Sequence, residues 1–179
     1  MGAIPRAQHA GLYHVMARSI AEERIFRVPE DFVDFVNALA LIEWECHAFC
    51  VMPTHYHVLA TLEENVLARA VHRLNRRYAT RFNRRHGRRG HVFDGPYRSV
   101  PVESERHFVW LARYLAQNPP APRSWQWSSF NRDFSFVDDG LLVEAFGGRG
   151  SLERYIFETL EPGSNQVREW PLGTGSRPR

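Results

Sequence analysis

The 179-residue sequence contains no lysine, only two cysteines and no long apolar run. Without a stretch of about 18 apolar residues no transmembrane helix is expected, and residues 1–11 lack the apolar core of a signal peptide, which favours a cytoplasmic protein. Cys46 and Cys50 lie in a segment with the composition of a strand, where their Cα atoms would be roughly 13 Å apart, too far for a disulfide. We expect both to be buried thiols in a reducing compartment.

All 23 basic residues are arginines, and they are unevenly distributed. From Arg69 to Arg98 the chain has ten arginines and a single acid, Asp94, so this segment carries +9 and leaves −6 on the rest of a chain whose total is +3. A guanidinium group binds phosphate oxygens in pairs and stacks on bases. Such arginine density is typical of a nucleic-acid contact, although a solvated basic helix face would have the same composition.

Apolar periodicity predicts a chain of alternating strands and helices. Strands are expected over residues 12–18, 45–52 and 55–62, with one or two short strands within 91–101. Long helices are expected over residues 29–42, from a cap at Asn65 to the glycines at 87 and 90, and from a cap at Ser104 to Gln117. Two short helices, 141–146 and 151–160, precede a tail of about a dozen residues, including 173–179, that we expect to be disordered.

This order of elements predicts an α+β fold, namely a ferredoxin-like antiparallel sheet with the helices on one face. We expect a catalytic domain over residues 1–130 and a small C-terminal helical extension with its tail over 131–179. Because folds of this class host many functions, the function has to be argued from particular side chains.

One candidate site is a histidine pair on the strand predicted over 55–62. Side chains alternate along a strand, so His55 and His57 project from one face, about 6.5–7 Å apart along the backbone, while Tyr56 points to the other face. Two imidazole nitrogens so placed can bind one metal ion. A His-x-His pair also arises easily by chance in a chain with nine histidines, so for the pair taken alone two half-buried strand histidines are the favoured interpretation.

A second candidate site is the third predicted helix, where Tyr114 and Asn118 are four residues apart. Residues at this spacing share a helix face, so the phenol and the amide would project together. A helix tyrosine followed by a helix-stopping Asn-Pro pair is the simpler interpretation of the same residues.

Four segments, taken together, resemble the single-strand-specific tyrosine transposases of the IS200-like group, and most closely the REP-associated tyrosine transposases. They are YHVMARS (13–19), CVMPTHYHVLATL (50–62), RLNRRYATRFNRRHGRRGHVFDGPYRSVPVES (73–104) and RYLAQNPPAPRSWQWSSF (113–130). In that family the segments correspond to the first strand, the His-hydrophobic-His strand, an Arg-rich helix with a glycine turn and strand, and the tyrosine helix. The resemblance is close over residues 11–130.

The resemblance implies a metal-dependent enzyme in which His55, His57 and Asn118 bind Mg²⁺ or Mn²⁺. Tyr114 would be the nucleophile that joins a 5′-phosphate and releases a 3′-OH. The implied substrate is single-stranded or hairpin DNA, such as repetitive extragenic palindromes, cut and rejoined at the nucleoid by a monomer or a homodimer. Phosphate contacts are expected from the arginines of the basic segment, namely Arg76, Arg77, Arg81, Arg84, Arg85 and Arg98.

Three positions depart from the family's usual pattern: Thr54 stands where asparagine is usual, Tyr56 where an aliphatic residue is usual, and Ser19 where glycine is usual. The Tyr56 change bears on packing, and the Ser19 change on DNA recognition. Two other interpretations stay open. One is a non-catalytic nucleic-acid-binding module on the same fold, and the other is a metal-dependent hydrolase of a small molecule, for which no further carboxylate ligands cluster near the histidines.

Overall fold

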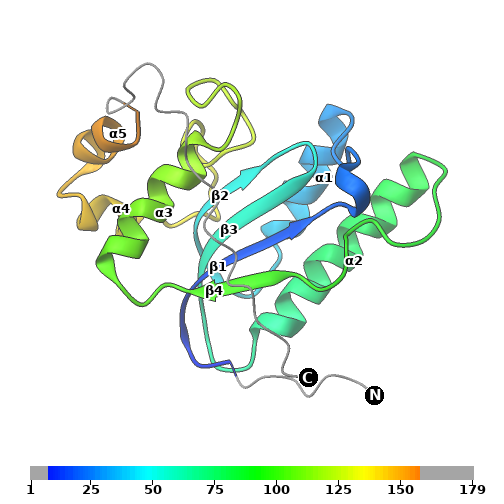
Figure 1. Cartoon of the computed structure of the whole chain (residues 1–179), viewed down its shortest axis with the longest axis horizontal. Coiled ribbons are helices and arrows are strands. Elements are labelled where there is room, and N and C mark those ends of the chain that lie inside the picture. Colours follow the sequence, from blue (N-terminus) through cyan, green and yellow to red (C-terminus); the bar gives the residue numbers. More distant parts are fainter. Residues whose placement is uncertain (1–7, 158–179) are drawn as a thin grey trace, which may run out of the picture.

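The structure is a computed structural model in which residues 8–157 are described. The predicted tail at 173–179 lies outside these residues, as does the end of the last predicted helix. Figure 1 shows the elements, which are β1 (Gly11–Arg18), the 3-10 turn η1 (Ile20–Glu22), α1 (Pro29–Leu39), β2 (Glu45–Val51), β3 (His55–Leu62), α2 (Leu67–Arg85), β4 (Arg98–Pro101), α3 (Glu105–Gln117), α4 (Gly140–Ala145) and α5 (Arg149–Phe157).

The four strands form one antiparallel sheet in the order β2-β3-β1-β4. The connection from β1 through α1 to β2 leaves β3 between the two strands, which is the split βαβ arrangement of ferredoxin-like folds. The predicted α+β class and antiparallel sheet are therefore confirmed. Within the 91–101 segment one strand forms, β4, and Phe93 adds an isolated bridge to Ser19.

Helices cover both faces of the sheet, which corrects the expectation that they lie on one face. On one face α1 and α2 enclose the main core, which includes Phe49 and Val58. On the other face α3, α4 and α5 enclose a second core around Ala48 and Leu59, and Figure 1 shows these helices across the strands from α1 and α2. The physical reason is that β2 and β3 carry apolar residues at successive positions, so both of their faces need a cover.

Two of the three predicted helix starts are confirmed. α1 begins at Pro29, and the Ser104 hydroxyl caps α3 by accepting the amide of His107 at 3.2 Å. Asn65 does not cap α2, because it adopts a positive φ of 59° and its side chain accepts the amide of Gln8 instead. The Gln8 side chain in turn accepts the amide of Leu67 at 3.1 Å, so a residue far away in sequence satisfies the first turn of α2.

Cys46 and Cys50 are free and buried in β2, as predicted. Burial raises the pKa of Cys46 to about 12 and also raises the pKa of Cys50, so both stay protonated thiols at neutral pH. Within residues 8–157 no helix is long and apolar enough to cross a membrane.

Candidate catalytic site

β3 presents His55 and His57 on the face of the sheet that α3 covers. Their ring centroids are 5.0 Å apart and the ring planes are nearly perpendicular at 89°. His57 is fully buried, whereas His55 is half-buried and has its Nδ1 2.9 Å from the Thr54 hydroxyl. Tyr56 points to the opposite core, where its hydroxyl donates to Asn75 Oδ1 at 2.8 Å. The predicted alternation along this strand is confirmed.

α3 places Tyr114 directly against the histidine pair. The Tyr114 ring meets the His57 ring edge to face, with centroids 5.3 Å apart, and it stacks on Trp110 at 5.0 Å. Leu111 and Leu115 anchor the buried side of the helix in the second core and so fix its rotation. Asn118 follows α3 with helical backbone angles, one turn beyond Tyr114 and half-buried. The tyrosine and the histidines are thus brought together, and Asn118 follows on the same helix face.

β1 adds two residues that the sequence analysis did not single out. His14 lies with its Nε2 2.9 Å from Nδ1 of His57, and its ring is 6.2 Å from the Tyr114 ring. Arg18 is paired in register with His55, so its side chain lies on the same face of the sheet. The alternation of β1 indicates one face for both residues, but only the pairing of β1 with β3 places them beside the histidines.

The donor atoms of the site suit a divalent metal ion. Nε2 of His57 is buried without a hydrogen-bond partner among the described residues, a costly state that a bound ion would relieve. Burial, together with repulsion from His14, His55 and Arg18, holds the pKa of His57 well below its usual value, so the ring is in the neutral form that binds metals.

Asn118 is the candidate for a third ligand from the protein. Among residues 8–157 no group of three or more His, Cys, Asp or Glu side chains could hold a metal ion. An ion at His55 and His57 could take further oxygens from Asn118 and from the substrate. Both are ligands that Mg²⁺ and Mn²⁺ accept.

Five of the six predicted DNA-binding arginines lie on α2, which covers the face of the sheet opposite the histidines. Four of them, Arg76, Arg77, Arg81 and Arg84, line a groove of about 610 Å³ on α2, together with Arg69, His72, Arg73 and Thr80. Two of the predicted arginines are engaged with acids, since Arg81 bonds to Asp34 and Arg85 bonds to both Asp31 and Asp34. The basic segment is thus partly a structural element.

Arg98 is the sixth of these arginines and lies on the other side of the molecule. It begins β4 and is paired with Met16, two residues from His14, so its exposed side chain shares the histidine face. Arg98 and Arg18 therefore place positive charge on the face that carries Tyr114, as binding of a phosphate there would require.

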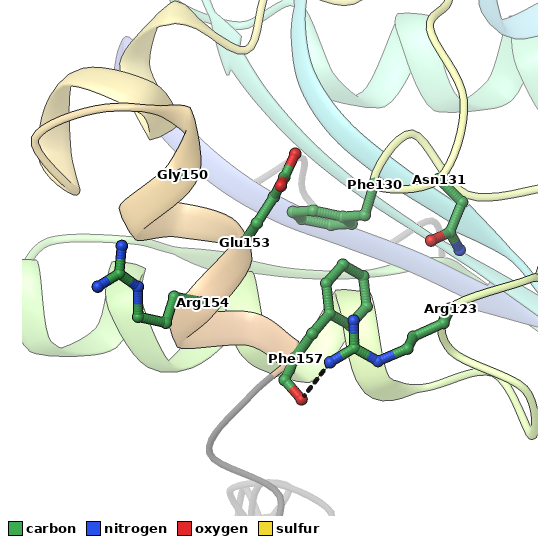
Figure 2. Close-up of a pocket in the computed structure, with 7 residues that line it drawn as sticks. All are labelled: Arg123, Phe130, Asn131, Gly150, Glu153, Arg154 and Phe157. Carbon is green, nitrogen blue, oxygen red and sulfur yellow. Dashed lines mark hydrogen bonds between the residues drawn. The ribbon is translucent and has the colours of Figure 1, made fainter.

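The C-terminal helix α5 is bonded to α3 and to the loop that follows it. The last three carbonyls of α5, at Tyr155, Ile156 and Phe157, accept hydrogen bonds from Arg113, Gln117 and Arg123 respectively, at 2.7–3.0 Å. Figure 2 shows the guanidinium of Arg123 beside Phe157 in a cavity of about 430 Å³. None of the predicted site residues lines this cavity, which lies between α5 and the segment that follows α3.

Comparison with known proteins bears on the family and the fold of the chain. The profile of the family described as "Transposase IS200 like" matches residues 7–118, more than half of the chain. A solved REP-associated tyrosine transposase bound to a REP hairpin is similar in fold, with a TM-score of 0.55 and 15% identity over 77% of this chain and 98% of that one. A putative transposase from Deinococcus radiodurans R1 has a TM-score of 0.46 and 20% identity, covering 64% of this chain and 95% of that one. A search of curated proteins gave no match. The chain belongs to the IS200-like transposase family.

Proposed function

We propose that this transposase cuts and rejoins single-stranded DNA through a covalent bond between Tyr114 and a 5′-phosphate. The observation that carries the proposal is the position of Tyr114, whose ring lies against His57 on a face that also holds Arg18 and Arg98. Tyr56 and Tyr78 are fully buried in the core on the other face, and burial raises the pKa of both. Neither of them suits a nucleophile.

In the proposed step the Tyr114 oxygen attacks the scissile phosphorus and the bond from phosphorus to the 3′ oxygen breaks. The phenol loses its proton and the 3′ oxygen gains one. One phosphoester replaces another, so a 3′-OH can reverse the reaction and rejoin strands without ATP. Mg²⁺ or Mn²⁺ held by His55, His57 and Asn118 would supply polarisation of the scissile phosphate and offset its developing charge.

The positions of the arginines suggest which part of the DNA substrate contacts each face of the protein. Arg98 and Arg18 would contact the strand that is cut. The α2 arginines lie on the opposite layer, so they would bind phosphates of other segments of the same substrate. A hairpin with a single-stranded flank offers both kinds of segment, and the structurally similar REP-associated transposase was solved with a REP hairpin. We expect the enzyme to act on such a substrate at the nucleoid, as a monomer or a homodimer.

The test incubates the protein and Mn²⁺ with a hairpin oligonucleotide that carries a single-stranded flank and a label at its 3′ end. Because the 5′-phosphate side stays on the protein, a 3′ label should appear in a denaturation-resistant adduct and a 5′ label in a released fragment. Tyr114→Phe and His57→Ala should abolish the adduct. Tyr13→Phe is the matched control, because it removes the same hydroxyl from a tyrosine whose ring packs on the other core.

Two outcomes would overturn the proposal. An adduct that survives Tyr114→Phe would assign the nucleophile elsewhere. Tight, salt-sensitive hairpin binding with no adduct in wild-type protein would favour the non-catalytic DNA-binding module.

A further inference from the structure

His14 on β1 is hydrogen-bonded to His57 on the neighbouring strand β3. Nε2 of His14 lies 2.9 Å from Nδ1 of His57, and the rings stack with centroids 5.1 Å apart and 21° between their planes. His14 is paired in register with Leu59, and Met16 with His57, so the two imidazoles are diagonal neighbours on one face. His14 is 8% exposed and His57 is fully buried, so water has little access to replace this bond.

Either ring can be the donor in this hydrogen bond, and the choice decides whether Nε2 of His57 carries a lone pair or a hydrogen. If Nδ1 of His57 donates to His14, Nε2 of His57 has a lone pair; if His14 donates, that Nε2 carries a hydrogen. The atom is buried and meets no hydrogen-bond partner among the described residues. An orphaned buried N–H is rarer in proteins than an unused acceptor, and only the lone-pair form can bind a cation.

We infer that His14 is a positioning residue that accepts the Nδ1 hydrogen of His57 and so directs the Nε2 lone pair toward the catalytic ion. The inference rests on the proposed function, because it takes His57 as a metal ligand. Metal-binding histidines commonly donate their second N–H to a fixed acceptor, and loss of that acceptor typically costs about 10- to 100-fold in metal affinity.

The test compares two variants at position 14 in the full chain. Glutamine can place an acceptor oxygen close to the position of Nε2, whereas leucine fills similar space without an acceptor. Calorimetric titration with Mn²⁺ should show an affinity about 10- to 100-fold lower in His14→Leu, with most of the loss recovered in His14→Gln. In the metal-free protein, nitrogen-15 NMR should find the His57 hydrogen at Nδ1 in wild type and His14→Gln. In His14→Leu the ring should be a mixture of the two neutral tautomers, with the hydrogen at Nδ1 in some molecules and at Nε2 in others.

The matched control is His47→Leu. His47 is 3% exposed on β2 and bonds through both ring nitrogens, to the Asp138 carbonyl at 2.9 Å and to the Thr61 hydroxyl at 2.7 Å. This variant loses an equally buried imidazole away from the site, and it should leave the Mn²⁺ affinity and the His57 tautomer unchanged.

Two results would overturn the inference: a His57 hydrogen at Nε2 in wild type, or an unchanged tautomer and Mn²⁺ affinity in His14→Leu. A different result would count against the proposed function instead. If wild-type His57 carries its hydrogen at Nδ1, and loses that preference in His14→Leu, but the wild type binds no Mn²⁺, the metal-assisted chemistry fails while His14 is still shown to set the tautomer.

Discussion

Nη1 of Arg85, near the end of α2, lies 2.6 Å from Oδ1 of Asp31 in the first turn of α1. The Asp31 side chain is fully buried. It also accepts hydrogen bonds from the backbone amides of Arg27 and Val28 and from Nε2 of His86, at 2.9–3.1 Å. One carboxylate thus caps α1 and joins it to α2. Arg85, which the sequence predicts to bind DNA, therefore stabilises the packing of α1 against α2.

The Asp31 network predicts a pH-dependent contribution to stability. Burial alone would raise the pKa of Asp31, but bonds from the Arg27 amide, Arg85, the Val28 amide and His86 lower it below its ordinary value. The contribution is therefore fully present above pH of about 4 and lost as the pH falls through the folded-state pKa. Asp31→Asn should lower the free energy of unfolding by about 2–3 kcal/mol at pH 7, and the difference should shrink near pH 3.

Urea unfolding at several pH values measures this contribution. Glu43→Gln is the control, since its pair with Arg73 is solvent-exposed and should be worth less than about 1 kcal/mol. A difference between wild type and Asp31→Asn that is the same at pH 7 and pH 3 would contradict the predicted lowering of the Asp31 pKa.

The arginines of α2 should separate into DNA-binding and structural residues. Arg76 and Arg84 are exposed beside the groove, so alanine at either position should weaken hairpin binding and lower the slope of log K against log salt by about 0.7–0.9. Arg85→Ala should chiefly lower the unfolding temperature, because it breaks the bonds to Asp31 and Asp34. Fluorescence anisotropy at several salt concentrations, with thermal unfolding alongside, checks both. Equal salt slopes in wild type and both groove variants would exclude the groove as a phosphate-binding surface.

The hydrogen bonds that Arg113, Gln117 and Arg123 donate to carbonyls of α5 predict a coupling between α5 and the tyrosine helix. Arg123→Ala removes a hydrogen bond to the Phe157 carbonyl and a cation–π contact with its ring. We expect about 1–2 kcal/mol less stability and faster amide exchange in both α5 and the end of α3. Arg149→Ala, at the exposed start of α5, is the matched control and should change stability by less than about 1 kcal/mol. Unchanged exchange in α3 would argue against the coupling.

Replacing the nucleophile should leave the fold intact. Tyr114→Phe keeps the ring that meets His57 and stacks on Trp110, so the free energy of unfolding should change by no more than about 1 kcal/mol while the covalent reaction is lost. Thermal unfolding followed by circular dichroism measures this. A large loss of stability would mean that Tyr114 is needed for folding, and the missing adduct would then say little about chemistry.

Local features of the fold could be predicted from the sequence, because they depend on neighbouring residues. The Pro53-Thr54 turn between two apolar runs predicts the hairpin of β2 and β3, and the two-residue period of a strand puts His55 and His57 on one face. Ser104 caps α3 as its type and position indicate.

Features that depend on long-range packing could not be predicted. The side of the sheet on which α3 lies, and hence the meeting of Tyr114 with His57, follows from how the whole chain buries both faces. His14 becomes part of the site only through the register of β1 with β3. The ion pair of Arg85 with Asp31 joins residues 54 positions apart, and Gln8 replaces Asn65 at the start of α2. Each of these contacts is made by residues whose own sequence neighbourhood does not indicate a partner.

The most direct test of Tyr114 as the nucleophile is to digest the protein–DNA adduct and locate the attached nucleotide by mass spectrometry. If Tyr114 is the nucleophile, the peptide that contains Tyr114 carries a nucleotide attached through its 5′-phosphate, and peptides with Tyr97 or Tyr155 are unmodified. A nucleotide on any other residue, or a link through a 3′-phosphate, would contradict it.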